Sequence, residues 1–141
     1  MEKDPNLFLI KPSRHLTGGG SEDLTTVRRL GAKALAWIAR KLHRISWTEV
    51  CYAMWTIRRE AIPLLNLDEK ILNRTNQWEW WLPYGHGFEF DQYVFFTLLK
   101  NDVKIIEIPT FELKRKTGGS SLFAPRDGLR TLWIIIRELL R

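Results

Sequence analysis

The sequence predicts an α/β fold in which a few strands are flanked by amphipathic helices. Two apolar runs, residues 7–10 and 103–111, are rich in leucine and isoleucine and end near prolines, as short strands do. Two longer segments, 21–42 and 127–141, repeat apolar residues at three- and four-residue steps, which is typical of helices with one buried face. Two strands alone would leave a parallel sheet poorly covered. We therefore expect part of a larger fold.

The first third of the chain predicts a strand, a glycine loop and a helix. Pro12 is expected to end the strand, and the Gly18–Gly19–Gly20 run is expected to be a flexible connector rather than an anion cradle. Ser21 is predicted to cap the helix, with Glu22 and Asp23 in its first turn. Its apolar side is predicted to comprise Leu24, Val27, Leu30, Ala34, Leu35, Ile38 and Leu42.

The remaining elements follow from local patterns. Residues 45–57 are mixed β-branched and aromatic, which predicts extended structure and a turn, and residues 58–65 predict a short helix that contains Pro63. A helix is expected over 88–100, and Pro109 is expected to mark a strand end or edge. Asp127 is predicted to cap the last helix, whose apolar side would be Leu129, Leu132, Trp133, Ile136 and Leu140.

Composition bounds the functional classes. The 141 residues suit a single unit spanning 1–141, and 45% apolar with 27% charged residues is a globular composition. The formal net charge of +6 favours anionic partners such as phosphates, acidic lipid headgroups or nucleic acid. No nucleic-acid-binding motif is present, so nucleic acid is the partner that we expect least.

Cysteine count and hydropathy predict a location. Cys51 is the only cysteine, so it cannot form an internal disulfide, and with three scattered histidines it cannot build a metal cluster. The first residues show no secretory signal pattern, and no apolar run is long enough to span a bilayer. We expect a cytoplasmic protein that lies, where it meets a membrane, on the inner face.

The segment 78–84 carries four aromatic residues and ends near a proline. One interpretation is a loop folded over the core. The other is an aromatic belt at a lipid surface, where indole rings prefer to sit, and it would make Trp78, Trp80 and Trp81 membrane-surface residues. The sequence leaves both interpretations open.

Three groups of motifs occur in a characteristic order over nearly the whole chain. The first is Lys11-Pro12-Ser13-Arg14, the glycine run 18–20 and Arg28-Arg29-Leu30-Gly31. The second is Thr48-Glu49-Val50-Cys51-Tyr52, followed by Arg58-Arg59-Glu60-Ala61. The third is Gly85-His86-Gly87-Phe88-Glu89, then Ile106-Glu107-Ile108-Pro109, then Arg115, Gly118 and Ser120, and finally Arg126-Asp127-Gly128-Leu129. Together, these motifs resemble the polyprenol-phosphate and dolichol-phosphate sugar synthase branch of family-two glycosyltransferases.

The resemblance implies a partial GT-A-like fold and transfer of a sugar from a nucleotide to a lipid phosphate or similar acceptor. By the same resemblance, Arg14 and Arg28 or Arg29 would meet the acceptor phosphate, because guanidinium groups offer paired donors to phosphate oxygens. Arg115, Gly118 and Ser120 would form a loop that closes on the diphosphate. Glu49 stands where the family has a catalytic-site aspartate, although its side chain is one methylene longer. Glu89 and Asp91 match an acidic pair in a helix of the family, and both a structural or capping role and a site role are open for them.

The resemblance also indicates what this chain lacks. In the family, the Asp-x-Asp motif and the nucleotide-binding strands precede the Ser-Arg strand, and this chain contains no Asp-x-Asp. We therefore predict an acceptor-side module without the donor-binding half, inactive alone, which either works with a separately encoded nucleotide-binding half or is the remnant of a split or truncated gene. Mg²⁺ or Mn²⁺ is expected only with that half, and no metal in this chain. The alternative is a non-catalytic protein that binds an anionic membrane surface or a partner.

Overall fold

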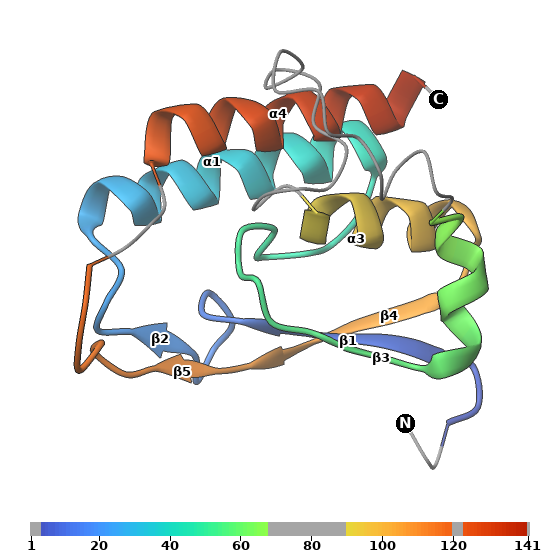
Figure 1. Cartoon of the computed structure of the whole chain (residues 1–141), viewed down its shortest axis with the longest axis horizontal. Coiled ribbons are helices and arrows are strands. Elements are labelled where there is room, and N and C mark those ends of the chain that lie inside the picture. The colour runs from blue at the N-terminus through green and yellow to red at the C-terminus, as the bar shows by residue number, and fades with distance from the viewer. Residues whose placement is uncertain (1–3, 68–89, 120–122, 141) are drawn as a thin grey trace.

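The computed structural model describes residues 4–67, 90–119 and 123–140, and these form a mixed α/β fold (Figure 1). The strands are β1 (Leu7–Ser13), β2 (Gly20–Ser21), β3 (Thr56–Ile57), β4 (Lys104–Pro109) and β5 (Phe111–Glu112). β1 is the middle strand of a three-stranded sheet, antiparallel to β3 and parallel to β4, and β2 pairs with β5 in parallel. The expected α/β class is confirmed, with five short strands in this part of the chain rather than the expected two.

β1 continues past the proline that was expected to stop it. Pro12 pairs with Ile108 in the β1–β4 ladder, and the strand ends at Ser13. The antiparallel neighbour β3 pairs only with Leu9 and Ile10, so β1 has a single strand neighbour at Pro12. A missing N–H is tolerated at such an edge position.

The helices are α1 (Thr26–His43), the 3₁₀-helix η1 (Arg59–Leu65), α3 (Phe90–Lys100) and α4 (Ala124–Leu140). Figure 1 shows α3 beside the strands, with α1 and α4 running next to each other as an outer layer on the same side. The predicted short helix at 58–65 is confirmed, and Pro63 lies within it. None of the helices in the described ranges is long and apolar enough to cross a membrane.

Two predicted helix starts are wrong. α1 begins at Thr26, where Thr25 caps it by accepting a hydrogen bond from Arg28 N at 3.4 Å, whereas Ser21 belongs to β2. The Ser21 hydroxyl instead organises the turn before the helix. α4 begins at Ala124, because the Asp127 carboxylate reaches back one turn to accept a hydrogen bond from Phe123 N at 2.8 Å.

The predicted apolar side of α4 is not its buried side. Ile134 and Ile135 are buried, whereas Leu129, Trp133 and Leu140 are 69%, 45% and 81% exposed. The buried side also carries polar positions, which the helix tolerates because their charges are paired: Lys100 and Arg137 both bind Glu138. The hydrophobic pattern alone cannot reveal such pairing between distant elements.

On α1, as on α4, several of the apolar residues that were predicted to be buried are exposed. It buries a stripe of small residues, Ala32, Ala36 and Ala39, and leaves Val27, Leu30 and Trp37 exposed. Leu35, Ile38 and Leu42 pack partly against the core, so three of the seven residues of its predicted apolar side are correct.

α3 is the central helix. Every residue from Asp91 to Leu98 is buried, as expected for a helix enclosed between the strands and the outer layer. The expected start of this helix near residue 88 lies outside the described residues. Phe95 and Phe96 form the middle of the core with Trp47.

Candidate functional site

Arg14 stands directly after β1 and is 7% exposed. Its Nε donates to Glu49 Oε2 at 3.0 Å, and its Nη1 donates to Glu112 Oε2 at 3.1 Å. Burial opposes the charge, but the two carboxylates outweigh it, so the pKa of the guanidinium is raised. The Tyr52 ring, whose centroid lies 4.4 Å from Arg14 Cζ, adds a cation–π contact. Arg14 is therefore a permanent, fixed cation.

Glu49 is enclosed rather than open to a pocket. It is 1% exposed; Oε2 accepts from Arg14, and Oε1 accepts from Cys51 N at 3.0 Å. The structure thus places the predicted catalytic carboxylate as a support for Arg14. This geometry suits positioning a cation, and His15, which lines a pocket described below, has its Nε2 3.5 Å from Glu49 Oε2. The predicted catalytic role of Glu49 stays a prediction.

A buried ion pair anchors the segment that carries Glu49. Lys11 on β1 lies 3.1 Å from Glu107 Oε1 on β4, and Lys11 Nζ also donates to the Glu49 carbonyl. Glu107 accepts hydrogen bonds from Thr48 N at 2.7 Å and Glu49 N at 3.1 Å. Sequence reasoning assigned no role to Lys11 or Glu107. For Lys11, the two-residue periodicity of the strand could have revealed its burial, because Lys11 continues the inward-facing positions 7 and 9 of β1.

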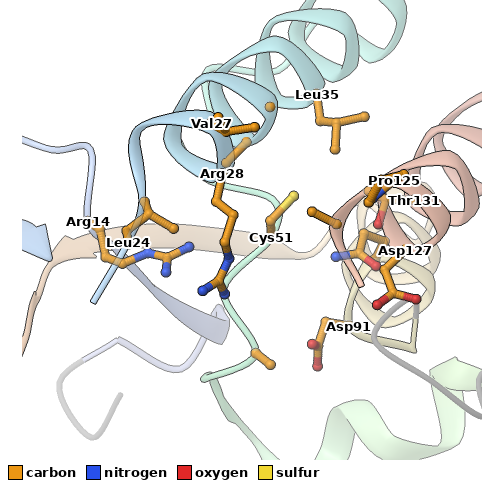
Figure 2. Close-up of a pocket in the computed structure, with 16 residues that line it drawn as sticks. Arg14, Leu24, Val27, Arg28, Leu35, Cys51, Asp91, Pro125, Asp127 and Thr131 are labelled. Atoms are coloured by element: carbon orange, nitrogen blue, oxygen red, sulfur yellow. The ribbon is translucent and has the colours of Figure 1, made fainter. Parts of the chain in front are cut away.

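A largely apolar pocket of about 310 Å³ lies between the first halves of α1 and α4 (Figure 2). Leu24, Val27 and Leu35 line it from the α1 side, and Pro125 and Thr131 line it from α4. Its polar lining includes Arg14, Arg28, Asp91, Gln92 and Asp127. Figure 2 shows the guanidinium groups of Arg14 and Arg28 on one side and the carboxylate of Asp91 on the other.

A second pocket of about 210 Å³ is basic. Arg14, His15, Arg29 and Lys33 line it together with the glycine loop at Gly19 and Gly20. Burial, and then the nearby cations Arg14, Lys33 and Arg29, lower the pKa of His15 despite the opposing charge of Glu49. The pocket therefore keeps its positive charge on arginine and lysine, and the imidazole of His15 remains a neutral lining group near neutral pH.

The two pockets share Arg14 and Leu24. Arg28 lines the apolar pocket, and its neighbour Arg29 lines the basic one, as expected for successive residues that point in different directions around a helix. Three of the predicted phosphate-binding residues are thus brought together. His15, Lys33 and Gln92 were not among the predicted site residues, and for Asp91 a site role and a structural role were both open.

Two of the predicted loop residues, Arg115 and Gly118, line neither pocket. Arg115 donates to the Gly119 carbonyl at 2.8 Å and to Asp23 at 3.3 Å. Gly118 adopts a left-handed φ of +74°. Ser120, Glu89 and the aromatic residues Trp78, Trp80 and Trp81 lie outside the described residues, so their predicted roles stay predictions.

The described ranges contain no group of three His, Cys, Asp or Glu side chains arranged to hold a metal ion. Comparison with protein-family models, with curated proteins and with solved structures gave no significant match to this chain.

Proposed function

We propose that this chain is the acceptor-binding module of a GT-A-type, family-two-like glycosyltransferase, and that it holds a lipid phosphate. The single observation that carries this proposal is the junction of an apolar pocket with a basic pocket at Arg14. An amphiphile with a phosphate head requires such a junction, because its tail needs an apolar lining and its head needs cations. The order of motifs along the sequence supports the glycosyltransferase part of the proposal.

Each basic residue has a distinct part in this proposal. Arg14, held by Glu49 and Glu112, provides a cation whose orientation is fixed before the phosphate arrives. Arg29 and Lys33 add charge from the basic pocket, and Arg28 adds it from the apolar side. A side chain that is already fixed loses little conformational entropy when the phosphate binds, so more of its interaction energy contributes to affinity.

Catalysis is assigned to the chain only together with a separately encoded nucleotide-binding half. Arg115, Gly118 and Ser120 are proposed to close over the diphosphate that this half would hold, and any Mg²⁺ or Mn²⁺ would bind there. The chain alone is expected to give no turnover with nucleotide sugars, either metal and polyprenyl phosphate. Turnover by the isolated chain would overturn this part of the proposal.

The binding test compares farnesyl phosphate, farnesol and inorganic phosphate, using the fluorescence of the tryptophans or calorimetry. Farnesyl phosphate should bind at least about tenfold more tightly than either half of it. Arg28→Gln and Arg29→Gln should each weaken its binding about tenfold, as loss of one charge-assisted contact does.

The matched control is Arg40→Gln, an exposed arginine of α1 that lines neither pocket. It should leave the dissociation constant unchanged. Equal binding of farnesol and farnesyl phosphate, or equal losses in all three arginine variants, would refute a phosphate site at Arg14.

A second candidate function is docking on an anionic membrane surface, and the observation that favours it is the number of exposed apolar side chains on α1 and α4. They are Val27, Leu30, Trp37, Leu129, Trp133, Leu139 and Leu140. Exposed Arg29, Lys33 and Arg40 on α1 and Arg126 on α4 accompany them. Apolar side chains with a basic rim are complementary to negatively charged lipid headgroups.

Liposome flotation with and without phosphatidylglycerol, over a salt series, tests this candidate. Binding should require the anionic lipid and weaken with salt. Trp133→Ser should reduce liposome binding several-fold, because it removes an indole that the lipid surface would bury. Ile62→Ser, which removes a similarly exposed apolar side chain from η1, should not. Flotation that is equal in both lipids would rule this function out.

A further inference from the structure

We propose that the ligand of the apolar pocket carries a hydroxyl group that donates a hydrogen bond to Asp91. This inference rests on the proposed function and narrows it, because it names the acceptor as a hydroxyl-bearing lipid phosphate. Asp91 lies in the first turn of α3 and lines the apolar pocket. In the view of Figure 2, its carboxylate lies across the pocket from Arg14 and Arg28.

Asp91 has unused acceptor capacity. Trp55 Nε1 donates to its Oδ1 at 2.7 Å, and within the described residues the carboxylate has no other hydrogen bond and no ion pair. An ionised carboxylate can accept about four hydrogen bonds, so most of its capacity remains free. The Asp91 carboxylate is only 9% exposed, and burying an ionised carboxylate costs free energy unless hydrogen bonds replace those it made to water.

Gln92, the next residue, adds a second unfilled acceptor beside the same pocket. Its Nε2 donates to the Val50 carbonyl at 2.6 Å, which fixes the amide. Its Oε1 is buried and has no partner in the described part of the chain. Unsatisfied buried acceptors are rare and call for an explanation. A donor group on a bound ligand would supply one for this end of the pocket.

The other carboxylate in the pocket lining shows that Asp91 is unusual. Asp127 accepts a hydrogen bond from Phe123 N at 2.8 Å and another from Arg126 Nε at 3.0 Å. Those contacts hold the start of α4, and they explain Asp127 as a structural residue. Among the described residues, Asp91 has only its bond to Trp55.

The chemistry of the pocket favours a neutral donor. Arg14 and Arg28 already balance the two carboxylates of the lining, Asp91 and Asp127, so a ligand ammonium group would give the pocket an excess of positive charge beside the arginines. A hydroxyl donates without bringing a charge. Burial raises the pKa of Asp91, against the opposing hydrogen bond from Trp55, and a carboxylate with raised proton affinity is a stronger acceptor for such a donor.

The test uses the full chain and three matched amphiphiles: a decanoyl ester of glycerol phosphate, its deoxy analogue without the free hydroxyl, and an analogue with an ammonium group in that place. The hydroxyl probe should bind about tenfold more tightly than the deoxy probe, which is the expected value of one hydrogen bond to a charged group. The ammonium probe should bind more weakly than the hydroxyl probe.

Variants connect the preference to Asp91. Asp91→Ala should abolish the hydroxyl preference, and Asp91→Asn, which keeps an acceptor oxygen for Trp55, should reduce it by at least half. Asp127→Asn makes the same chemical change in the same pocket and should leave the preference intact. If Asp91→Ala does not fold, the hydroxyl preference of Asp91→Asn still tests whether Asp91 accepts the hydrogen bond.

The outcomes separate this inference from the proposed function. Equal binding of the hydroxyl and deoxy probes overturns the inference and leaves a lipid phosphate site standing. Tighter binding of the ammonium probe also overturns it. Failure of all three probes to bind overturns both.

Discussion

Arg14 and Glu49 form a buried ion pair in which Arg14 Nε lies 3.0 Å from Glu49 Oε2. Both side chains are at most 5% exposed, and Glu112 supplies a second carboxylate to the same guanidinium from β5. The pair joins the end of β1 to the irregular segment before β3. It therefore couples the fold to the cation that the proposed phosphate site needs.

Glu49→Gln should destabilise the protein by about 3 kcal/mol, because removing one partner of a buried pair leaves the other charge less compensated. Urea unfolding followed by tryptophan fluorescence measures the change. Glu60→Gln, at an exposed position of η1, should change stability by less than about 0.5 kcal/mol. A Glu49→Gln protein as stable as the native chain would show that Glu112 alone suffices for Arg14.

The glycine loop after Arg14 predicts opposite effects for the same substitution at two positions. A Cβ at Gly19 would lie 2.6 Å from the Ser13 carbonyl oxygen, which is backbone and cannot move away easily. Gly19→Ala should therefore destabilise the protein by about 2 kcal/mol, the usual cost of forcing an atom into a packed site. Urea unfolding midpoints provide the measurement.

Gly31 is the matched comparison, since it lies inside α1 and a Cβ there would meet nothing within 4 Å. Gly31→Ala should stabilise the protein by about 0.8 kcal/mol, the difference in helix propensity. Destabilisation by both substitutions would mean that α1 has no room at Gly31. A Gly19→Ala protein with unchanged stability would mean that the loop does not approach Ser13 closely.

The sequence predicted the elements better than their faces. The strand at 103–111 and its end at Pro109, the short helix around Pro63 and the α/β class all follow from local patterns. The buried side of α4 does not, because Glu138 becomes acceptable inside only once Lys100, 38 residues earlier, reaches it. Local hydrophobic periodicity carries no information about such a pairing.

The candidate site was predictable in part for the same reason. The arginines 14, 28 and 29 were expected at a phosphate, and they do line two adjoining pockets. For Asp91 the sequence left a structural or capping role and a site role equally open, and Gln92 was missed, because α3 is mostly apolar and a polar residue in its first turn is ordinary. Only the tertiary position of α3 against α1 and α4 makes them pocket residues.

Glu138 should make stability depend on pH. Burial would raise its pKa, but hydrogen bonds from Lys100 and Arg137 lower it below the ordinary value of 4.5. Its contribution to stability is therefore fully present above pH 4.5 and is lost as pH falls through the lower folded-state pKa. Glu138→Gln should cost about 2 kcal/mol near neutral pH, the value of a hydrogen bond between charged groups.

That cost should shrink as the pH is lowered below 4.5, since the native carboxyl then becomes protonated as well. Urea unfolding of both proteins over a pH series measures it. A difference that stays constant down to low pH would contradict the ion pairing seen between α3 and α4.

Cys51 should be an unreactive thiol. Burial, and then the charge of Glu49, raise its pKa to about 12 from the ordinary 9.0, against the opposing cations Arg14 and Lys11. Only the thiolate reacts, so alkylation of the folded chain near pH 8 should be about a thousandfold slower than in urea. Iodoacetamide labelling followed by mass spectrometry tests this directly, because the chain has one cysteine. Rapid labelling of the folded protein would show that the segment around Cys51 opens frequently.

Asp91 should behave in the opposite way to Glu138, and this contrast separates a binding carboxylate from a structural one. Burial raises the pKa of Asp91 above 3.8, so the folded state binds this proton more readily than the unfolded state. Stability consequently falls as pH rises from 3.8 through the folded-state pKa, and the cost is fully present above that pKa. Asp91→Asn removes the charge while its amide oxygen can still accept from Trp55. It should be more stable than the native chain near neutral pH, and the advantage should disappear as the pH approaches 3.8. A carboxylate that destabilises the free protein is explained by a role in ligand binding. An Asp91→Asn protein that is less stable than the native chain would show that the carboxylate stabilises the fold, and it would remove this reason to assign a ligand to Asp91.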